Sequence, residues 1–156
     1  MFSIRTNAPE ETARLAERLA ADIVPGTVLA LSGGLGAGKT LFVQHVARAL
    51  GVKGEVTSPT FQLMNLYCGK KNMPIVHFDL YRLETPEELD DIGFHEYAEQ
   101  PDGLVVIEWP DKFAEELPED YIRIAIERTG DGENSRELTF EKFGEQQTFE
   151  RWQEKC

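Results

Sequence analysis

A glycine-rich segment that ends in a lysine and a threonine carries the clearest chemistry in this sequence. Residues 33–40 read Gly-Gly-Leu-Gly-Ala-Gly-Lys-Thr and fit the pattern G-x-x-x-x-G-K-[ST]. Glycines let successive backbone N–H groups curl around a phosphate without Cβ clashes, and a following helix adds positive charge at its start. We expect Lys39 to reach the β and γ phosphates of a nucleotide and Thr40 to place its hydroxyl on Mg²⁺.

The flanking residues give this segment the context that phosphate binding requires. Residues 27–32 have the apolar centre of a strand buried on both faces, and apolar residues then repeat with helical spacing from Thr40 until Gly51. The glycines do not form the dinucleotide pattern G-x-G-x-x-G, because Lys39 stands where glycine is needed. A phosphate-binding loop is therefore favoured over a dinucleotide-binding one. The structural alternative is a glycine turn with a solvated lysine.

Two acidic residues follow short segments that resemble buried strands. Asp79 follows residues 75–78, and Glu108 follows residues 104–107. An acid at such a strand end can hold the Mg²⁺ shell or orient a water, although it can equally be a solvated terminus or a cap. His77 is a possible general base but is more typical of a packed, hydrogen-bonded histidine. Arg82 could contact phosphate or pair with a nearby acid, and the sequence does not separate these roles.

Two further features have both a functional and a structural interpretation. Thr57-Ser58-Pro59-Thr60 could sense a γ-phosphate as a switch segment does, or could form an ordinary turn before a strand. Trp109 could seal the site or meet a partner, or it could belong to the core.

The remaining elements predict an α/β fold. We expect a P-loop NTPase-type domain spanning residues 1–156, with a mainly parallel central sheet, flanking helices and antiparallel additions. The start of the chain is expected to lead directly into the first helix, and the last dozen residues to be helical or frayed. The patterns predict helices at 8–22, from 40 to 50 and from a capping box at 85–88 through Ile92. They predict strands at 27–32, 61–67, 74–80, 104–109, 121–128 and 135–143.

Composition narrows the class of protein further. The 156 residues fit one domain, and the formal charge of −12 disfavours tight nucleic-acid binding unless a local basic patch overrides it. The longest apolar runs have four residues, so no membrane span is expected. The start of the chain lacks the pattern of a secretory signal, which favours a cytoplasmic protein. Cys68 and Cys156 have no partner at metal-ligand spacing and are interpreted as free thiols.

Four segments in this order resemble those of a known bacterial family, TsaE. They are residues 33–40, Thr57-Ser58-Pro59-Thr60-Phe61, His77-Phe78-Asp79-Leu80-Tyr81-Arg82-Leu83 with Pro86-Glu87-Glu88-Leu89, and Ile107-Glu108-Trp109-Pro110. The resemblance implies a small ATPase of tRNA threonylcarbamoyladenosine biosynthesis, with ATP and Mg²⁺ as cofactors. It further implies that ATP hydrolysis supports turnover of a complex of TsaD, which transfers the threonylcarbamoyl group, with TsaB, and that tRNA is contacted only through that complex.

The resemblance also implies roles for individual residues. The residues implied to bind ATP are Gly33, Leu35, Gly36, Ala37, Gly38, Lys39 and Thr40. Those implied to act in catalysis are Lys39, Asp79 and Glu108, with Thr40 and Glu108 as Mg²⁺ ligands. The implied switch and partner residues are Thr57, Ser58, Pro59 and Thr60, followed by Glu108 and Trp109.

Two other functions remain open at this point. A small-molecule kinase could use the same glycine loop, and would yield a phosphorylated product instead of free phosphate. A non-catalytic nucleotide sensor could use Asp79 and Glu108 only to order loops, and its turnover would not change on Glu108→Ala.

Overall fold

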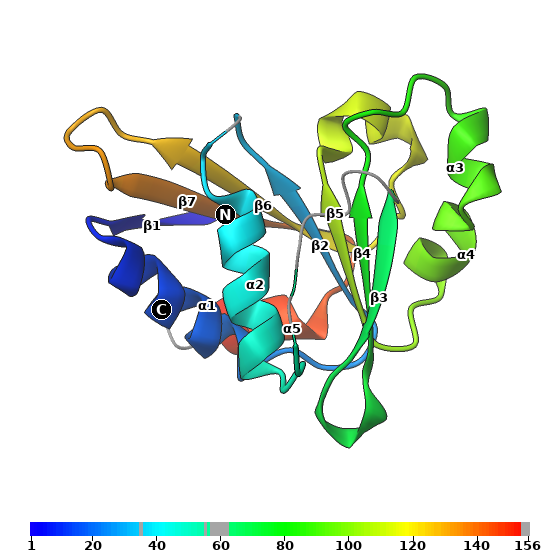
Figure 1. Cartoon of the computed structure of the whole chain (residues 1–156), viewed down its shortest axis with the longest axis horizontal. Coiled ribbons are helices and arrows are strands. Elements are labelled where there is room, and N and C mark those ends of the chain that lie inside the picture. Colours follow the sequence, from blue (N-terminus) through cyan, green and yellow to red (C-terminus); the bar gives the residue numbers. More distant parts are fainter. Residues whose placement is uncertain (35, 55, 57–62, 154–156) are drawn as a thin grey trace.

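The computed structural model describes residues 1–34, 36–54, 56 and 63–153 (Figure 1). Its strands are β1 Phe2–Thr6, β2 Thr27–Ser32, β3 Met64–Cys68, β4 Pro74–Asp79, β5 Leu104–Glu108, β6 Tyr121–Arg128 and β7 Arg136–Phe143. Its helices are α1 Pro9–Ala20, α2 Lys39–Ala49, α3 Glu87–Asp91, α4 Phe94–Glu99 and α5 Gln147–Gln153, with 3₁₀ turns η1 Lys70–Asn72 and η2 Pro110–Glu116.

The seven strands form one mixed sheet in the order β1-β7-β6-β2-β5-β4-β3. Its centre is parallel, because β2 pairs in parallel with both β5 and β6, and β4 pairs in parallel with β5. The outer pairs β3–β4, β6–β7 and β1–β7 are antiparallel. The predicted α/β architecture with a mainly parallel centre and antiparallel additions is confirmed.

Helices cover both faces of the sheet, as Figure 1 shows. Side chains of α1, α2 and α5 pack with Leu29 and Leu31 of β2 on one face. Side chains of α3 and α4 pack with Val28 of the same strand on the other face. Residues 27–32 are therefore buried on both faces, as their continuous apolar character predicts.

The structure corrects the prediction at several places. The strand predicted at 61–67 begins at Met64 and ends at Cys68, because Leu63 has a φ of 62°, and the strand predicted at 74–80 ends at Asp79. The chain does not lead directly into a helix, because Phe2–Thr6 forms β1 and pairs with β7. The first helix is shorter than 8–22 and ends at Ala20. The strand predicted at 104–109 ends at Glu108, since Trp109 has a φ of 60°, which an extended strand cannot contain.

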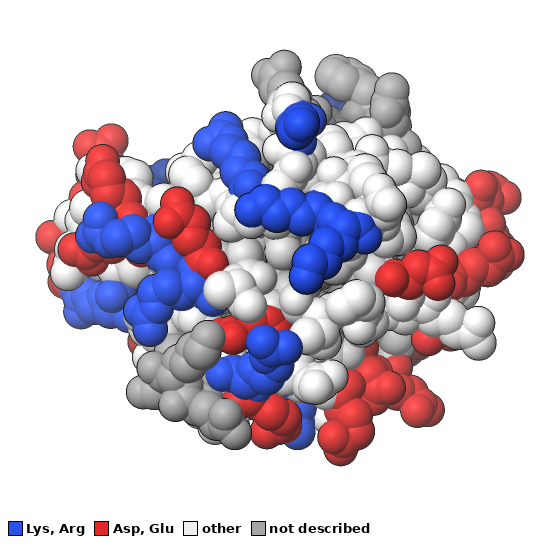
Figure 2. All heavy atoms as spheres, turned by 90° about the horizontal axis from the view of Figure 1, so that it is seen from below, with Lys and Arg blue, Asp and Glu red and all other residues white. Residues whose placement is uncertain are grey.

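Charge is distributed unevenly over the surface. Figure 2 shows the molecule from below, where lysine and arginine side chains gather across the middle of the face. Four exposed basic side chains lie near the end of α2 and at the β3–β4 turn: Arg48, Lys53, Lys70 and Lys71. A hydrogen bond from Lys70 N to Leu50 O joins these two segments. The expectation that this acidic chain repels a nucleic-acid backbone applies least to this face.

Within the described ranges, the structure contains no helix that is both long and apolar enough to cross a membrane.

Candidate functional site

The glycine loop, residues 33–40, connects the carboxyl end of β2 to the first turn of α2. Gly33, Gly36 and Gly38 have φ values of 145°, 76° and 107°, a region that side-chain-bearing residues rarely adopt. A Cβ on Gly33 would lie 2.4 Å from the backbone oxygen of Ile126 in β6. The loop therefore needs glycine for its own conformation and for its approach to the neighbouring strand; Leu35 lies outside the described residues.

Two arginines from the β6–β7 pair hold the outer side of this loop. Arg128 Nη2 donates to the Gly36 carbonyl at 3.1 Å, and Arg136 Nε donates to the Ala37 carbonyl at 3.0 Å. In a trans peptide the N–H points away from the carbonyl, so anchoring Ala37 O turns the N–H of Gly38 to the opposite side. Reasoning from the sequence missed both arginines, because their position depends on which strand lies beside β2.

We expect Arg136→Met to lower the free energy of unfolding by about 1.5–3 kcal/mol, because the guanidinium is a charged donor to several carbonyls. It also donates from Nη1 to Glu133 O and Ser135 O, at 2.8 and 3.0 Å. Arg128→Met, at an exposed position that holds the Gly36 carbonyl, is the matched control and should cost less. Urea unfolding of both variants measures the difference, and equal losses would contradict a special role for Arg136.

Lys39 is the first residue of α2, and its side chain folds back over the loop. Its Nζ donates to the Gly33 carbonyl at 2.5 Å and lies 3.3 Å from the centroid of the Trp109 ring. Burial lowers the pKa of the Lys39 ammonium below its ordinary value of 10.5, and the nearby carboxylates, of which Glu108 has the largest effect, oppose that shift. The site thus holds a partly desolvated cation close to the backbone of the loop.

The two candidate acids meet at the carboxyl ends of adjacent parallel strands. Asp79 ends β4, Glu108 ends β5, and their Cα atoms are partners in the register. Both side chains are buried, so the interpretation as solvated strand ends is wrong. Glu108 Oε1 accepts a hydrogen bond from Thr40 Oγ1 at 3.3 Å, and Asp79 Oδ1 accepts from the backbone N–H of Tyr81 at 3.0 Å.

His77 lies two residues before Asp79 on β4 and is fully buried. Its Nε2 is 2.6 Å from Glu108 Oε2. The interpretation of His77 as a packed, hydrogen-bonded histidine is confirmed, and its partner is one of the candidate acids.

Trp109 lies partly in the core and partly over the Lys39 side chain. It is partly buried against the core cluster under α3 and α4, and its ring also covers the Lys39 ammonium. The ring centroid lies 4.8 Å from that of Tyr81. A bulky residue at a φ of 60° is a backbone outlier, and such outliers cluster at functional sites.

These side chains enclose a cavity of about 370 Å³ at the carboxyl edge of the sheet. Its lining consists of Gly34, Gly36, Ala37, Gly38, Lys39, Thr40, Leu41, Asp79, Tyr81, Arg82, Glu108 and Trp109. The cavity therefore brings together the described loop residues from Gly34 onward and both acids, and it adds Tyr81, which the sequence did not single out. The predicted switch residues Thr57, Ser58, Pro59 and Thr60 lie outside the described residues.

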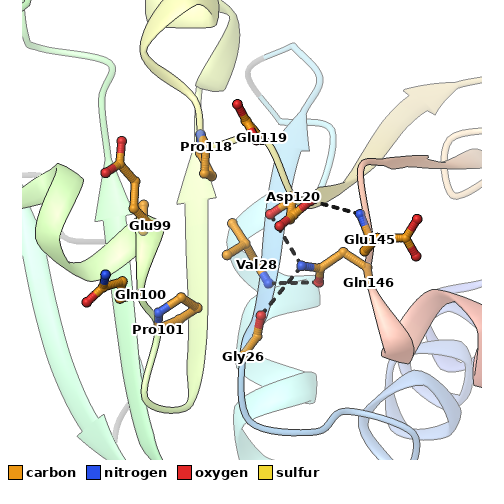
Figure 3. Close-up of a pocket in the computed structure, with 11 residues that line it drawn as sticks. Gly26, Val28, Glu99, Gln100, Pro101, Pro118, Glu119, Asp120, Glu145 and Gln146 are labelled. Atoms are coloured by element: carbon orange, nitrogen blue, oxygen red, sulfur yellow. Dashed lines mark hydrogen bonds between the residues drawn. The ribbon is translucent and has the colours of Figure 1, made fainter.

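A second cavity, of about 480 Å³, lies at the opposite, amino end of the strands (Figure 3). Gln146 reaches between β2 and β6 there, accepting from Val28 N and donating to the carbonyls of Gly26 and Asp120. These hydrogen bonds use the Gln146 amide to join β2 to the start of β6, so its role in this cavity is structural.

The fold and the site define a mixed α/β protein whose buried polar site lies where a central strand passes through a glycine loop into a helix. The family model described as "Threonylcarbamoyl adenosine biosynthesis protein TsaE" matches residues 6–138. The chain belongs to the TsaE family, which confirms the resemblance of its motifs.

Individual relatives agree with this assignment. The chain is 42% identical over 140 residues to the tRNA threonylcarbamoyladenosine biosynthesis protein TsaE of Bacillus subtilis, a match that covers 90% of this chain and 85% of the relative. It is 39% identical over 134 residues to TsaE of Treponema pallidum, covering 86% of this chain and 96% of the relative. The crystal structure of Bacillus subtilis YdiB superposes with a TM-score of 0.76 at 36% identity, covering 99% and 92% of the two chains.

Proposed function

We propose that this chain is a Mg²⁺-dependent ATPase that supports tRNA threonylcarbamoyladenosine biosynthesis. The observation that carries the proposal is the convergence of Lys39, Thr40 and Glu108 at the end of the glycine loop. Thr40 bonds Glu108, and the Lys39 ammonium lies close enough to both carboxylates for their charges to act on it. A nucleotide triphosphate with its metal ion requires such a set of cation, hydroxyl and carboxylate.

The donor set fits Mg²⁺ rather than a metal held by protein alone. Thr40 and Glu108 offer hard oxygen atoms, and Asp79 is adjacent. Among the described residues, no group of three or more His, Cys, Asp or Glu side chains could hold a metal ion. Mg²⁺ suits such a site because it keeps several waters and binds through one or two carboxylates plus the phosphates of the substrate.

The residues of the chain then act by position and charge. Lys39 would exchange its bond to the Gly33 carbonyl for the β and γ phosphates, and the backbone N–H groups of the loop would cradle them. Thr40 and Glu108 would hold Mg²⁺, and the bound ion would supply positive charge against the charge that develops on the phosphates. Asp79 would orient the attacking water. Phosphoryl transfer needs such positioning and electrostatic stabilisation more than a strong base.

ATP hydrolysis by this chain would support turnover of a TsaD–TsaB complex that transfers the threonylcarbamoyl group. The pathway named for the relatives supports this role. The formal charge of −12 supports contact with tRNA only through that complex, because an acidic chain docks on proteins more readily than on phosphate backbones.

Phosphate release from ATP, with and without the cognate TsaD and TsaB, tests this role. We expect slow release by the chain alone, faster release with both partners, and loss of both rates in Lys39→Ala and Glu108→Ala. Partners that neither bind the chain nor alter its rate would contradict the proposed role in turnover.

A further inference from the structure

His77 and Thr40 hold opposite oxygens of the same carboxylate. His77 is fully buried in β4, with Val106 of β5 and Asn65 of β3 as its Cα partners on either side. Its Nε2 lies 2.6 Å from Glu108 Oε2, and Thr40 Oγ1 lies 3.3 Å from Glu108 Oε1. Since the Glu108 side chain is itself only 3% exposed, these contacts determine how the carboxylate is turned.

The hydrogen-bond chemistry fixes which atom donates. A carboxylate that binds a cation is ionised and has only acceptor atoms, so in that state the Nε2–H of His77 donates to Glu108 Oε2. The other ring nitrogen, Nδ1, is buried without a hydrogen-bond partner among the described residues. Leaving a buried polar atom unsatisfied destabilises the fold. An apolar residue would avoid that cost at this position, which indicates that the Nε2–H bond serves the site rather than the core.

We infer that His77 is a positioning residue that holds Glu108 Oε2, so that Glu108 presents Oε1 toward Thr40 and the metal. This inference rests on the proposed function, because Thr40 and Glu108 are the Mg²⁺ ligands proposed there. With Oε2 engaged by His77, Glu108 would offer the metal its other oxygen and would be a poor acceptor for a proton from water. Orientation of the attacking water is then left to Asp79, the other acid at this edge of the sheet.

Two substitutions separate the donor from the bulk of the ring. His77→Gln places an amide N–H close to the position of Nε2 and keeps a donor, whereas His77→Leu fills a similar volume without one. The measurement is the calorimetric dissociation constant of a non-hydrolysable ATP analogue, first with EDTA and then at increasing Mg²⁺. The readout is the ratio of the dissociation constants without and with Mg²⁺. If His77 only filled the core, its substitution would not change this ratio.

We expect His77→Leu to reduce this Mg²⁺-linked tightening by about 10-fold or more, the effect typical of losing a residue that orients a metal ligand. Binding in EDTA should change little, and His77→Gln should retain most of the tightening. Where His77→Leu does not fold, His77→Asn takes its place, because its amide is too short to reach Oε2. In a Glu108→Ala background, His77→Leu should have no further effect, since the two residues act through one contact.

The outcomes distinguish this inference from the proposed function. A wild-type chain whose affinity does not respond to Mg²⁺ would contradict the proposed function, and the inference with it. A responsive wild type with an equally responsive His77→Leu or His77→Asn variant would overturn the positioning role alone. An additive effect of His77→Leu and Glu108→Ala would also overturn it.

Discussion

Gly33→Ala is expected to lower the free energy of unfolding by about 3 kcal/mol or more, and to abolish nucleotide binding. Gly33 has a φ of 145°, and a Cβ there would lie 2.4 Å from the backbone oxygen of Ile126. Because that oxygen belongs to β6, the clash cannot be relieved by rotating a side chain. Either the loop or the strand must move, and the carbonyl that accepts from Lys39 moves with it. Urea unfolding and calorimetric ATP titration measure the two effects.

Gly34→Ala is the matched control for this prediction. A Cβ on Gly34 would meet no atom within 4 Å, and its φ is not in the left-handed region. The control should stay within about 0.5 kcal/mol of the wild type, as is usual for surface substitutions. Equal losses in the two variants would show that the loop tolerates no side chain at all, and would contradict the specific role of the Gly33–Ile126 approach.

Lys39→Met is expected to remove ATP binding while leaving the unliganded chain at least as stable as the wild type. The burial that lowers the pKa of Lys39 disfavours its charged form in the folded state, and methionine has no charge to desolvate. ATP binding, in contrast, should be lost, because the variant lacks the cation that would balance the negative charge of the phosphates. Thermal unfolding with and without Mg²⁺ and ATP measures both effects, because a ligand stabilises only the variant that binds it.

The difference in stability between the Lys39→Met variant and the wild type should depend on pH in one direction. Since the pKa of Lys39 is lower in the folded than in the unfolded chain, the unfolded state binds its proton more readily. The cost of the buried charge is therefore present below the folded pKa, and it disappears as pH rises from there toward 10.5. The stability advantage of Lys39→Met should shrink over that range.

Lys53→Met, at an exposed position, is the control and should change neither stability nor ATP binding. A Lys39→Met chain that is clearly less stable than the wild type at neutral pH would contradict the account of a partly desolvated lysine.

The parts of the site that the sequence predicts are those that depend on local order. The strand, glycine loop and helix around Lys39 are contiguous, so their pattern is sufficient to predict them. Asp79 and Glu108 could be selected as strand ends because residues 75–78 are apolar apart from His77, and residues 104–107 are continuously apolar. Parallel pairing of their strands then brings the two acids to the same edge of the sheet.

The parts that the sequence does not predict depend on pairing between distant strands. The bond between His77 and Glu108 requires β4 and β5 to be neighbours in one register. The hydrogen bonds from Arg128 and Arg136 to the loop require the β6–β7 pair to lie beside β2. The strand β1, with its short alternation of Phe2 and Ile4, gains its stability from β7 rather than from its own pattern.

The fate of the γ-phosphate tests the central proposal most directly. The purified chain is mixed with Mg²⁺ and ATP labelled at that phosphate, in the presence of TsaD and TsaB, and the labelled products are separated. We predict that the label leaves as inorganic phosphate, and that Lys39→Met and Glu108→Ala abolish its release. Label retained in ATP would contradict hydrolysis at this site, and label transferred to an organic product would indicate a kinase instead.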